Sequence, residues 1–387
     1  MKIDAMIKRE DFFRILSDTI TEYFSSVKGQ HIRFEYKKVK GLQALVINQK
    51  FSFICCVPVP AGLKKSLFEE YNIRGSRLKY ILGKILVALV SICPYMGMAG
   101  KAYITPGLPG KNVYISPQNR SIRFFDYDSM TVDCIIKKGF SDKYFNNQIE
   151  FRKNYHYDFL LPMTVHGDNW FREPILSGHP LARVTNEKMY QKGISNALEG
   201  IVQLAADTMT YVSLKEYAAS LIDSIRRKCQ AAEQSKHIRS GNRVMEITDY
   251  VEKSLSALQM DIPVVMGHGD FQSGNIWVDD NGKTWIYDWE TAGRRSIWYD
   301  CATLNYSLRR AYGWNDFFAD NTCEKMLTAD PRKEYTSEEI SAIRYVVLLE
   351  DFLFYLDDML ELPEDWGGNI FDGFMDRIIS LYDEGKI

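Results

Sequence analysis

The chain has 387 residues, of which 46% are hydrophobic and 13% aromatic. This excludes the polar composition of a disordered protein and predicts two or three domains. The formal net charge is −2, so no overall charge indicates a nucleic-acid partner, and we expect none. Seven cysteines are scattered without a CxxC pair. This argues against a disulfide framework or a zinc site and favours a reducing, cytoplasmic location.

Residues 1–107 are predicted to form a mixed α/β accessory region. An amphipathic pattern predicts a helix over 11–26, and apolar runs predict strands within 42–59. Helical spacing follows over 66–92. The turn cluster Thr105-Pro-Gly-Leu-Pro-Gly110 then marks a boundary.

Residues 108–185 contain short apolar segments, separated by turns, that predict strands around one helix. The helix is expected to begin near Ser141 and to end near Tyr155. The expected strands are 112–116, 122–127, 131–138, 160–165 and 170–176.

Residues 186–387 are mainly helical by composition and spacing. Short strands are expected among the helices, at 263–266 and in the pair 276–278 and 285–287. The predicted helices before these strands are 186–212, 214–230 and 244–258, and further helices continue to the end of the chain.

The stretch that carries chemistry is His268-Gly-Asp270-Phe-Gln-Ser-Gly-Asn275, followed by Asp288-Trp-Glu290. It places two aspartates and one asparagine at the ends of short apolar strands. Phosphoryl transfer needs a carboxylate that orients the attacking hydroxyl and accepts its proton. It also needs oxygen ligands for Mg²⁺, which prefers carboxylate and amide oxygens to His or Cys.

This motif resembles the aminoglycoside phosphotransferase and choline kinase family over roughly residues 108–360. The resemblance implies an ATP- and Mg²⁺-dependent kinase acting on a hydroxyl of a small molecule, such as a sugar, an amino alcohol or an aminoglycoside-like compound. The implied residue roles are Asp270 as catalytic base, Asn275 and Asp288 as metal ligands with Glu290 assisting, and His268 and Asp300 as structural residues of the catalytic loop.

The resemblance also implies an α+β, protein-kinase-like bilobal fold, with a small antiparallel-sheet N-lobe and a mainly helical C-lobe. Residues 108–185 would form the nucleotide-binding N-lobe and hinge, and residues 186–387 the C-lobe with the catalytic loop and substrate site. Residues 1–107 would be an extra α/β region outside the family pattern.

A lysine for the nucleotide phosphates is expected at the end of the strand 131–138. Lys137 and Lys138 are the candidates, and Lys137 is favoured because Cys-Ile-Ile-Lys has the apolar-apolar-Lys order of the kinase strand. Glu150, on the following helix, is the expected ion-pair partner. No GxGxxG loop precedes this strand, which favours a small-molecule kinase over a protein kinase.

Two further groups of residues are expected near ligands. Glu173, Ile175 and Leu176 fall in the segment that resembles the hinge beside adenine. Asp351, Tyr355 and Asp358 have helical spacing, and acids with aromatics suit either a cationic substrate or a sugar. An ordinary amphipathic helix with a solvated acidic face explains the second group equally well.

The segment 64–94 combines lysines and arginines with an apolar stretch that is too short for a transmembrane helix. This composition predicts either a packed accessory helix or a peripheral contact with an anionic membrane. A membrane contact would suit a kinase of a surface-glycan or lipid-linked acceptor. The remaining alternative is a nucleotide-binding pseudokinase, and the sequence fixes no oligomeric state.

Overall fold

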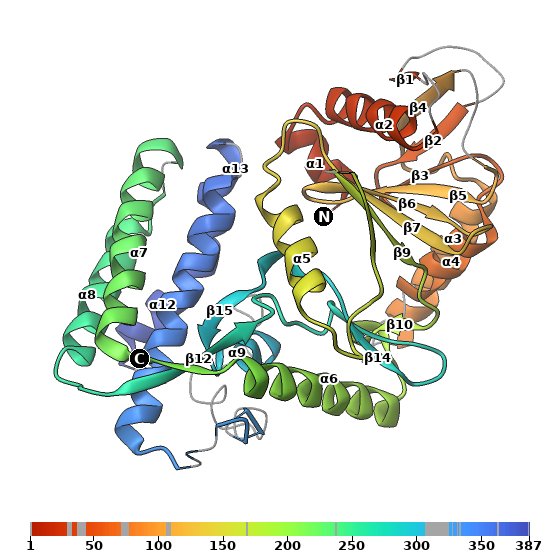
Figure 1. Ribbon diagram of the computed structural model, residues 1–387. Helices are drawn as coiled ribbons and strands as arrows, with labels where there is room; N and C mark the ends of the chain where they lie inside the picture. The colour runs from red at the N-terminus through yellow and green to blue at the C-terminus, as the bar shows by residue number, and fades with distance from the viewer. Residues whose placement is uncertain are drawn as a thin grey trace. The chain divides into compact units, whose positions relative to one another are not determined.

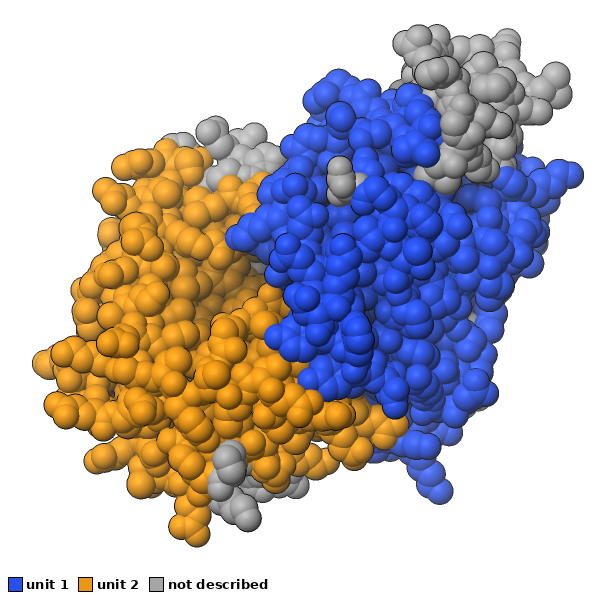
Figure 2. Space-filling model, viewed as in Figure 1, with its two compact units in different colours: residues 1–193, 276–290 blue, residues 194–275, 291–387 orange. Residues whose placement is uncertain are grey.

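The computed structural model describes residues 2–28, 33–36, 44–70, 77–105, 110–167, 169–236, 238–305, 325–326, 328–330, 332, 334–361, 364–385 and 387 (Figure 1). The chain forms two compact units, which Figure 2 shows in different colours. Unit 1 comprises Met1–Gly193 and Ile276–Glu290. Unit 2 comprises Ile194–Asn275 and Thr291–Ile387. Each unit is built from two separate parts of the sequence.

Among the described residues, unit 1 contains a nine-stranded antiparallel sheet in the order β1-β4-β2-β3-β5-β6-β7-β9-β8. The strands are β1 (Arg33–Tyr36), β2 (Ala44–Asn48), β3 (Phe53–Cys55), β4 (Met98–Thr105), β5 (Val113–Pro117), β6 (Ser121–Asp126), β7 (Thr131–Ile136), β8 (Thr164–His166) and β9 (Trp170–Pro174). β3 pairs with β5 through Ile54 and Ile115. Residues 1–107 and 108–185 therefore share one sheet, and the turn cluster near residue 107 does not divide the two units.

The two faces of this sheet carry different helices, because neighbouring residues in a strand point to opposite sides. On one face, side chains such as Phe124 and Ile135 form an apolar cluster with α1 and α2. On the other face, Tyr114 packs with α3 and α4, and Cys134 packs with α5. The helices are α1 (Ile3–Arg9), α2 (Phe12–Lys28), α3 (Ala61–Glu70), α4 (Arg77–Ile92) and α5 (Lys143–Asn154).

Unit 1 also contains a small sheet of β10 (His179–Pro180), β13 (Ile276–Val278) and β14 (Thr284–Ile286). The short helix η1 (Leu181–Arg183) follows β10. Gly178 precedes β10 with φ +83°, and a Cβ there would lie 2.1 Å from the carbonyl oxygen of Val278. Only glycine fits this approach, so the link after β9 is fixed against β13.

Unit 2 is mainly helical, with a three-stranded sheet in the order β11-β12-β15. α6 (Glu187–Thr208) leads into it across the division between the units. The other elements are β11 (Thr210–Ser213), α7 (Leu214–Lys236), α8 (Gly241–Leu255), β12 (Asp261–Gly267), η2 (Trp289–Thr291), which begins in unit 1, β15 (Gly293–Ser296), α9 (Tyr299–Asn305), α12 (Ser337–Glu361) and α13 (Glu364–Asp383).

The α+β class is confirmed, and most predicted helices are present. The helical pattern over 66–92 falls on two helices, α3 and α4, and α1, β1 and β4 were not predicted. The helix expected over 186–212 ends at Thr208, and β11 takes up the next residues. β10 and β15 were not expected, because both are too short to show a periodic pattern and form only by pairing with β13 and β12. Across the described ranges, no helix is both long enough and apolar enough to cross a membrane.

Candidate active site

The loop that follows β12 is held by backbone hydrogen bonds to one buried carboxylate. Asp300 accepts from the backbone N–H of His268 at 2.6 Å and of Gly269 at 2.9 Å. Gly269 has φ +86°, and a Cβ there would lie 2.4 Å from the carbonyl oxygen of Thr291. The hydroxyl of Thr291 donates to the carbonyl oxygen of His268. The loop is thus fixed at its first two residues by groups that come later in the chain.

Within the loop, the polar side chains converge on Asp270. The amide nitrogen of Asn275 donates to the backbone oxygen of Asp270 at 2.9 Å and to its Oδ2 at 3.1 Å, and Gln272 Nε2 donates to Oδ2 at 2.9 Å. His268 is fully buried and accepts the backbone N–H of Asp270 through Nδ1. The His-Gly-Asp-x-x-x-x-Asn spacing therefore creates a closed loop that orients one partly exposed carboxylate.

A second group of polar residues lies in unit 1, after the β13–β14 hairpin. Asp279 closes this hairpin by accepting the backbone N–H groups of Asn281 and Lys283, both at 2.9 Å. Two residues after β14, Asp288 has φ +70°, a conformation that residues other than glycine rarely adopt. Such strain often accompanies a functional constraint, since it must be compensated by the surrounding structure.

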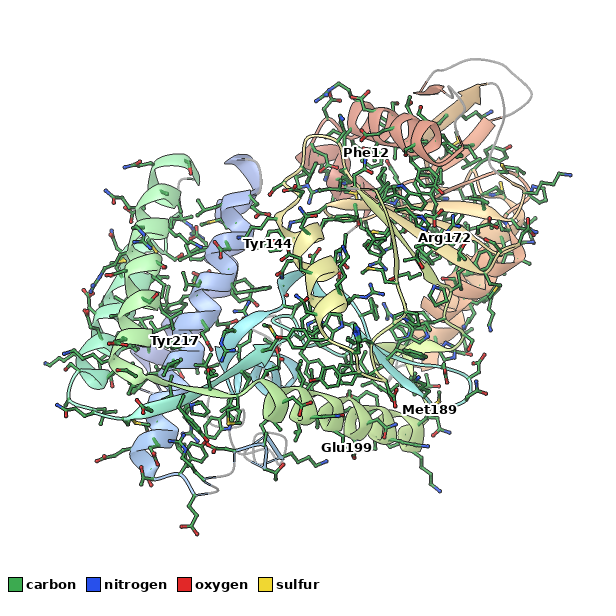
Figure 3. The ribbon with its side chains drawn as sticks, in the orientation of Figure 1. Phe12, Tyr144, Arg172, Met189, Glu199 and Tyr217 are labelled. Carbon is green, nitrogen blue, oxygen red and sulfur yellow. The ribbon has the colours of Figure 1, made fainter. Side chains whose placement is uncertain are left out.

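Glu290 is held by neighbours from the N-terminal side of unit 1. Its Oε1 accepts from Arg120 at 3.1 Å, and its backbone oxygen accepts from Asn147 at 2.9 Å. The guanidinium of Arg120 also lies over the ring of Tyr144, which is labelled in Figure 3, at 4.1 Å from the ring centroid. The Glu290 carboxylate therefore already has a cationic partner.

The predicted ion pair between Lys137 and Glu150 is wrong. Lys137 Nζ lies 2.6 Å from Glu10 Oε1, and its side chain is only 1% exposed. Glu150 is exposed on α5. The physical reason is strand parity: Lys137 continues the side of Ile135, which faces α1 and α2, whereas α5 covers the opposite face. Burial lowers the pKa of Lys137 to about 8, although Glu10 opposes this change.

Lys138, the other candidate, is also occupied on the α2 side. Its Nζ pairs with Glu22 at 2.9 Å, with 61% of its side chain exposed, and its backbone N–H donates to Thr19. The side-chain hydrogen bond to Glu22 raises the pKa of Lys138. Neither of the two candidate lysines, Lys137 and Lys138, is paired on the face of the sheet that α5 covers.

That face instead carries a buried ion cluster that the sequence analysis did not find. Arg152 Nη1 of α5 lies 3.1 Å from Glu173 Oε2 of β9, and Arg123 Nη1 of β6 lies 4.0 Å from Glu173 Oε1. Glu173 is therefore a partner of two arginines. Ile175 and Leu176, which follow it, are half-buried. The backbone N–H of Ile175 donates to Met130 in the β6–β7 turn, which fixes this segment at the end of the sheet.

The candidate substrate residues all lie on α12. Tyr355 is buried, and Asp351 accepts a long hydrogen bond from Tyr299 at 3.4 Å. Asp358 is partly exposed on the same helix. Their helical spacing is thus present in the structure, but burial of Tyr355 fits the alternative of an ordinary packed helix.

Glu350, which precedes Asp351 on α12, has a structural role. It is 1% exposed and accepts from the backbone and hydroxyl of Ser296 and from the hydroxyl of Tyr217, which is labelled on α7 in Figure 3. Burial raises the pKa of Glu350, and these hydrogen bonds oppose the rise. Glu350 therefore ties α12 to β15 and α7.

Metal ligands of the histidine, cysteine and carboxylate type do not gather in the described parts of the chain. No group of three such side chains is placed to hold an ion there.

Several solved structures of kinases are similar to part of the chain. A choline/ethanolamine kinase family protein from Mesorhizobium loti has 17% identity and a TM-score of 0.47, covering 72% of this chain and 90% of that one. Plasmodium vivax ethanolamine kinase has 14% identity and a TM-score of 0.47, with coverages of 84% and 97%. Aminoglycoside phosphotransferase APH(3'')-Id from Streptomyces rimosus has 15% identity and a TM-score of 0.38, with coverages of 62% and 92%.

The sequence itself matches a family model over a third of its length. No curated protein matches the chain by sequence. The model of the phosphotransferase enzyme family, APH, matches residues 197–325, a segment that contains the loop 268–275 and Asp288. The resemblance drawn from the motif is therefore confirmed: over residues 197–325 this chain resembles the phosphotransferase enzyme family.

Proposed function

We propose that the protein is an ATP- and Mg²⁺-dependent phosphotransferase that moves the γ-phosphate to a hydroxyl group of a small molecule. The observation that carries this proposal is the closed loop around Asp270, in which Asn275 and Gln272 orient one carboxylate. The match of residues 197–325 to the phosphotransferase enzyme family supports the same class of reaction.

The donors of the proposed metal site have the right chemistry for Mg²⁺. The amide nitrogen of Asn275 is used twice on Asp270, which leaves its amide oxygen as the atom for a cation. Asp288 contributes a carboxylate in a strained backbone conformation. Glu290 is the third candidate, with Arg120 as its present partner. These residues would hold Mg²⁺, which would neutralise charge on the phosphates.

The chain's own residues would act by orientation and proton transfer. Asp270 orients the acceptor hydroxyl and takes its proton as the new phosphate ester bond forms and the bond to the leaving ADP breaks. Asp300 keeps the loop in place through His268 and Gly269, so the base does not need to reorganise during the reaction.

The acceptor class is proposed only as a hydroxyl-bearing small molecule. Asp351, Tyr355 and Asp358 remain the candidates for contact with it, and acids beside an aromatic ring suit an amino alcohol, an aminoglycoside-like compound or a sugar. A glycan or lipid-linked acceptor is the alternative, and the surface of α4 described below is the observation that favours it.

The experiment is to measure ADP release with Mg²⁺-ATP across sugars, choline, ethanolamine, aminoglycosides and nucleosides. A productive acceptor is expected, and Asp270→Asn should lower kcat by roughly 10²- to 10⁴-fold. Nucleotide binding, measured by calorimetry, should be retained in this variant. Full turnover in Asp270→Asn would overturn the assignment of the base. Binding of ATP without turnover on any acceptor would support the pseudokinase alternative.

A further inference from the structure

The face of the nucleotide-lobe sheet that α5 covers has no lysine on β7. Cys134 and Ile136 of β7 point to this face and pack with apolar residues of α5 and β9. Lys137 is paired with Glu10 on the opposite face. A cation for phosphates on the α5 side must therefore come from another strand.

Arg123 of β6 is in that position. It lies directly opposite Cys134 in the β6–β7 register, so the two side chains are on the same face of the sheet. Its side chain is 19% exposed. Nε is buried and has no hydrogen-bond partner among the described residues. The Nε of Arg152, in the same ion cluster, is also buried without a hydrogen-bond partner among the described residues, and burial of an unpaired donor is costly.

The charges around Arg123 leave it only partly neutralised. Glu173 makes its shorter contact with Arg152, at 3.1 Å, and lies 4.0 Å from Arg123. Two guanidinium groups thus share one carboxylate in a buried place. Burial lowers the pKa of Arg123, and its interactions with Cys134 and Glu173 raise it by more. The guanidinium therefore remains charged.

We propose that Arg123 binds the phosphate groups of the nucleotide, which is the role expected for Lys137 from the sequence. This inference rests on the proposed function. The planar guanidinium can donate two parallel hydrogen bonds to phosphate oxygens, which an ammonium group cannot do. Glu173 then serves as the positioning residue for Arg123, and Arg152 fixes Glu173.

The test compares ligands that differ only in their phosphates. Binding of adenosine, ADP and ATP with Mg²⁺ is measured by calorimetry for the wild type and Arg123→Gln. We expect ATP affinity to fall at least tenfold and adenosine affinity to stay unchanged. Arg123→Lys, which keeps the charge, should recover part of the ATP affinity. A merely structural arginine would change adenosine and ATP binding alike.

Arg172→Gln is the matched control, because Arg172 of β9 also pairs with a carboxylate, Asp133, but on the α2 side of the sheet. Its ATP affinity should stay near the wild-type value. Wild-type affinity for ATP in Arg123→Gln would overturn this inference and leave the proposed function standing. Absence of ATP binding in the wild type would overturn both.

A different observation, on the surface of unit 1, carries a second inference. α4 buries only a narrow stripe, with Val87 and Val90 packed against α3 and β3. Many of its other side chains are large, apolar and exposed. Its large exposed side chains are Leu78, Tyr80, Ile81, Leu82, Ile85, Leu86, Leu89 and Ile92, with exposures from 39% to 84%, and Tyr95 and Met96 follow directly. Soluble monomers rarely expose so continuous an apolar surface.

The dimensions of this surface suit an interfacial helix. α4 has 16 residues, so it is about 24 Å long at 1.5 Å per residue. That is shorter than the roughly 30 Å hydrocarbon core of a bilayer. A helix of this kind lies in the membrane plane with its apolar face inserted between the headgroups.

The surrounding charge indicates which occupant fits. Residues 71–111 contain six basic residues and no aspartate or glutamate. Lys101 lies over the ring of Tyr95, beside the apolar surface, and Lys65 of α3 is 64% exposed and lies 4.0 Å from Asp280. In a symmetric dimer through α4, the excess of basic residues in this segment of both copies would be brought together and would repel. An anionic surface complements them.

We infer that α4 docks on an anionic lipid membrane and brings the enzyme to its acceptor there. The test is flotation with phosphatidylcholine vesicles, with or without phosphatidylglycerol, at low and high salt. Wild-type protein should float with the anionic vesicles, and salt should weaken this binding. Leu82→Glu with Ile85→Glu should abolish flotation. Met130→Glu, a change at a 51% exposed apolar residue in the β6–β7 turn, should not.

The other occupants of this surface give distinct results. A wild-type dimer in light scattering that Leu82→Glu with Ile85→Glu converts to a monomer, without flotation, would identify a second copy and overturn the membrane inference. A soluble monomer that floats with neither type of vesicle would overturn it in favour of a protein partner. Equal flotation with neutral and anionic vesicles would overturn the part assigned to the basic residues.

Discussion

The loop 268–275 and the end of β7 both carry residues to which the family resemblance assigned a chemical role, and they differ in where their partners lie. In the loop, Asp270 receives Gln272 and Asn275, which are two and five residues away. At the end of β7, Lys137 pairs with Glu10, which is 127 residues away in sequence. Local partners follow from spacing, whereas a distant partner follows from the packing of helices on a sheet.

The difference shows which interactions a sequence motif can predict. A short loop with fixed residue spacing has few ways to form hydrogen bonds among its polar groups, so the motif predicts which of them pair. A charge at a strand end has two faces available, and the helices that cover each face decide its partner. Three predictions test this comparison.

Glu10→Gln is expected to have the largest effect. Glu10 also accepts from Arg9 at 3.0 Å, and the side chains of Arg9 and Lys137 are 2% and 1% exposed. Loss of the carboxylate removes the anion that neutralises two buried cations, which should lower the free energy of unfolding by about 3–5 kcal/mol. Urea denaturation measures this loss.

Glu22→Gln is the control, since Glu22 pairs with the exposed Lys138. It should leave the midpoint of denaturation unchanged. If the two variants lost the same stability, the distant pair would not stabilise unit 1 as its burial indicates, and the contrast with the loop would disappear.

Asp300→Ala tests the other side of the comparison. It removes both acceptors that hold the backbone of His268 and Gly269, and the loop should shift. We expect kcat to fall by about 100-fold, because displacement of a catalytic group by about 1 Å has an effect of this size. Steady-state kinetics with the acceptor found above measures it.

The matched control for this variant is Asp372→Ala. Asp372 is also a buried aspartate that accepts two backbone N–H groups, those of Arg239 and Ser240, but at the start of α8. It should lose stability and keep kcat. An equal fall in kcat in both variants would mean that general destabilisation, and not the loop, explains the loss.

The smallest effect is a pH dependence of stability from Lys137. Its pKa is lowered to about 8 from an ordinary value of 10.5. Between these values the unfolded chain binds a proton that the folded protein does not, so the free energy of unfolding rises with pH through this window. Below about pH 8 the cost of burying the charge is fully present. Lys137→Met should lack the rise, which we expect to be on the order of 1–2 kcal/mol.

Denaturation of both proteins at pH 7.5 and pH 10 checks this, because other titrations cancel in their difference. Parallel changes in the wild type and Lys137→Met would show that Lys137 keeps its ordinary pKa. The pair with Glu10 would then fully compensate the burial of the ammonium group.

Much of the fold followed from patterns along the chain. Helices such as α2 and α7 and the strands β5 to β7 show clear periodicity, and the structure contains them near the predicted bounds. β10 and β15 could not be predicted, because strands of two and four residues are stabilised by the neighbours they pair with. The joining of residues 1–107 to residues 108–185 in one sheet through β3 and β5 likewise depends on pairing between distant segments.

The sequence by itself determined the motif around Asp270 and its internal spacing, because Gln272 and Asn275 are local partners of Asp270. The requirement for glycine at position 269 comes from the tertiary structure, where a Cβ would meet the carbonyl oxygen of Thr291. Only the tertiary structure decided which cation faces the α5 side of the sheet. Alternation of side chains along β7 directs Lys137 to the face where Glu10 lies. The β6–β7 register places Arg123 opposite Cys134. Strand register and helix packing are set by the burial of apolar side chains from distant segments, which local spacing does not specify.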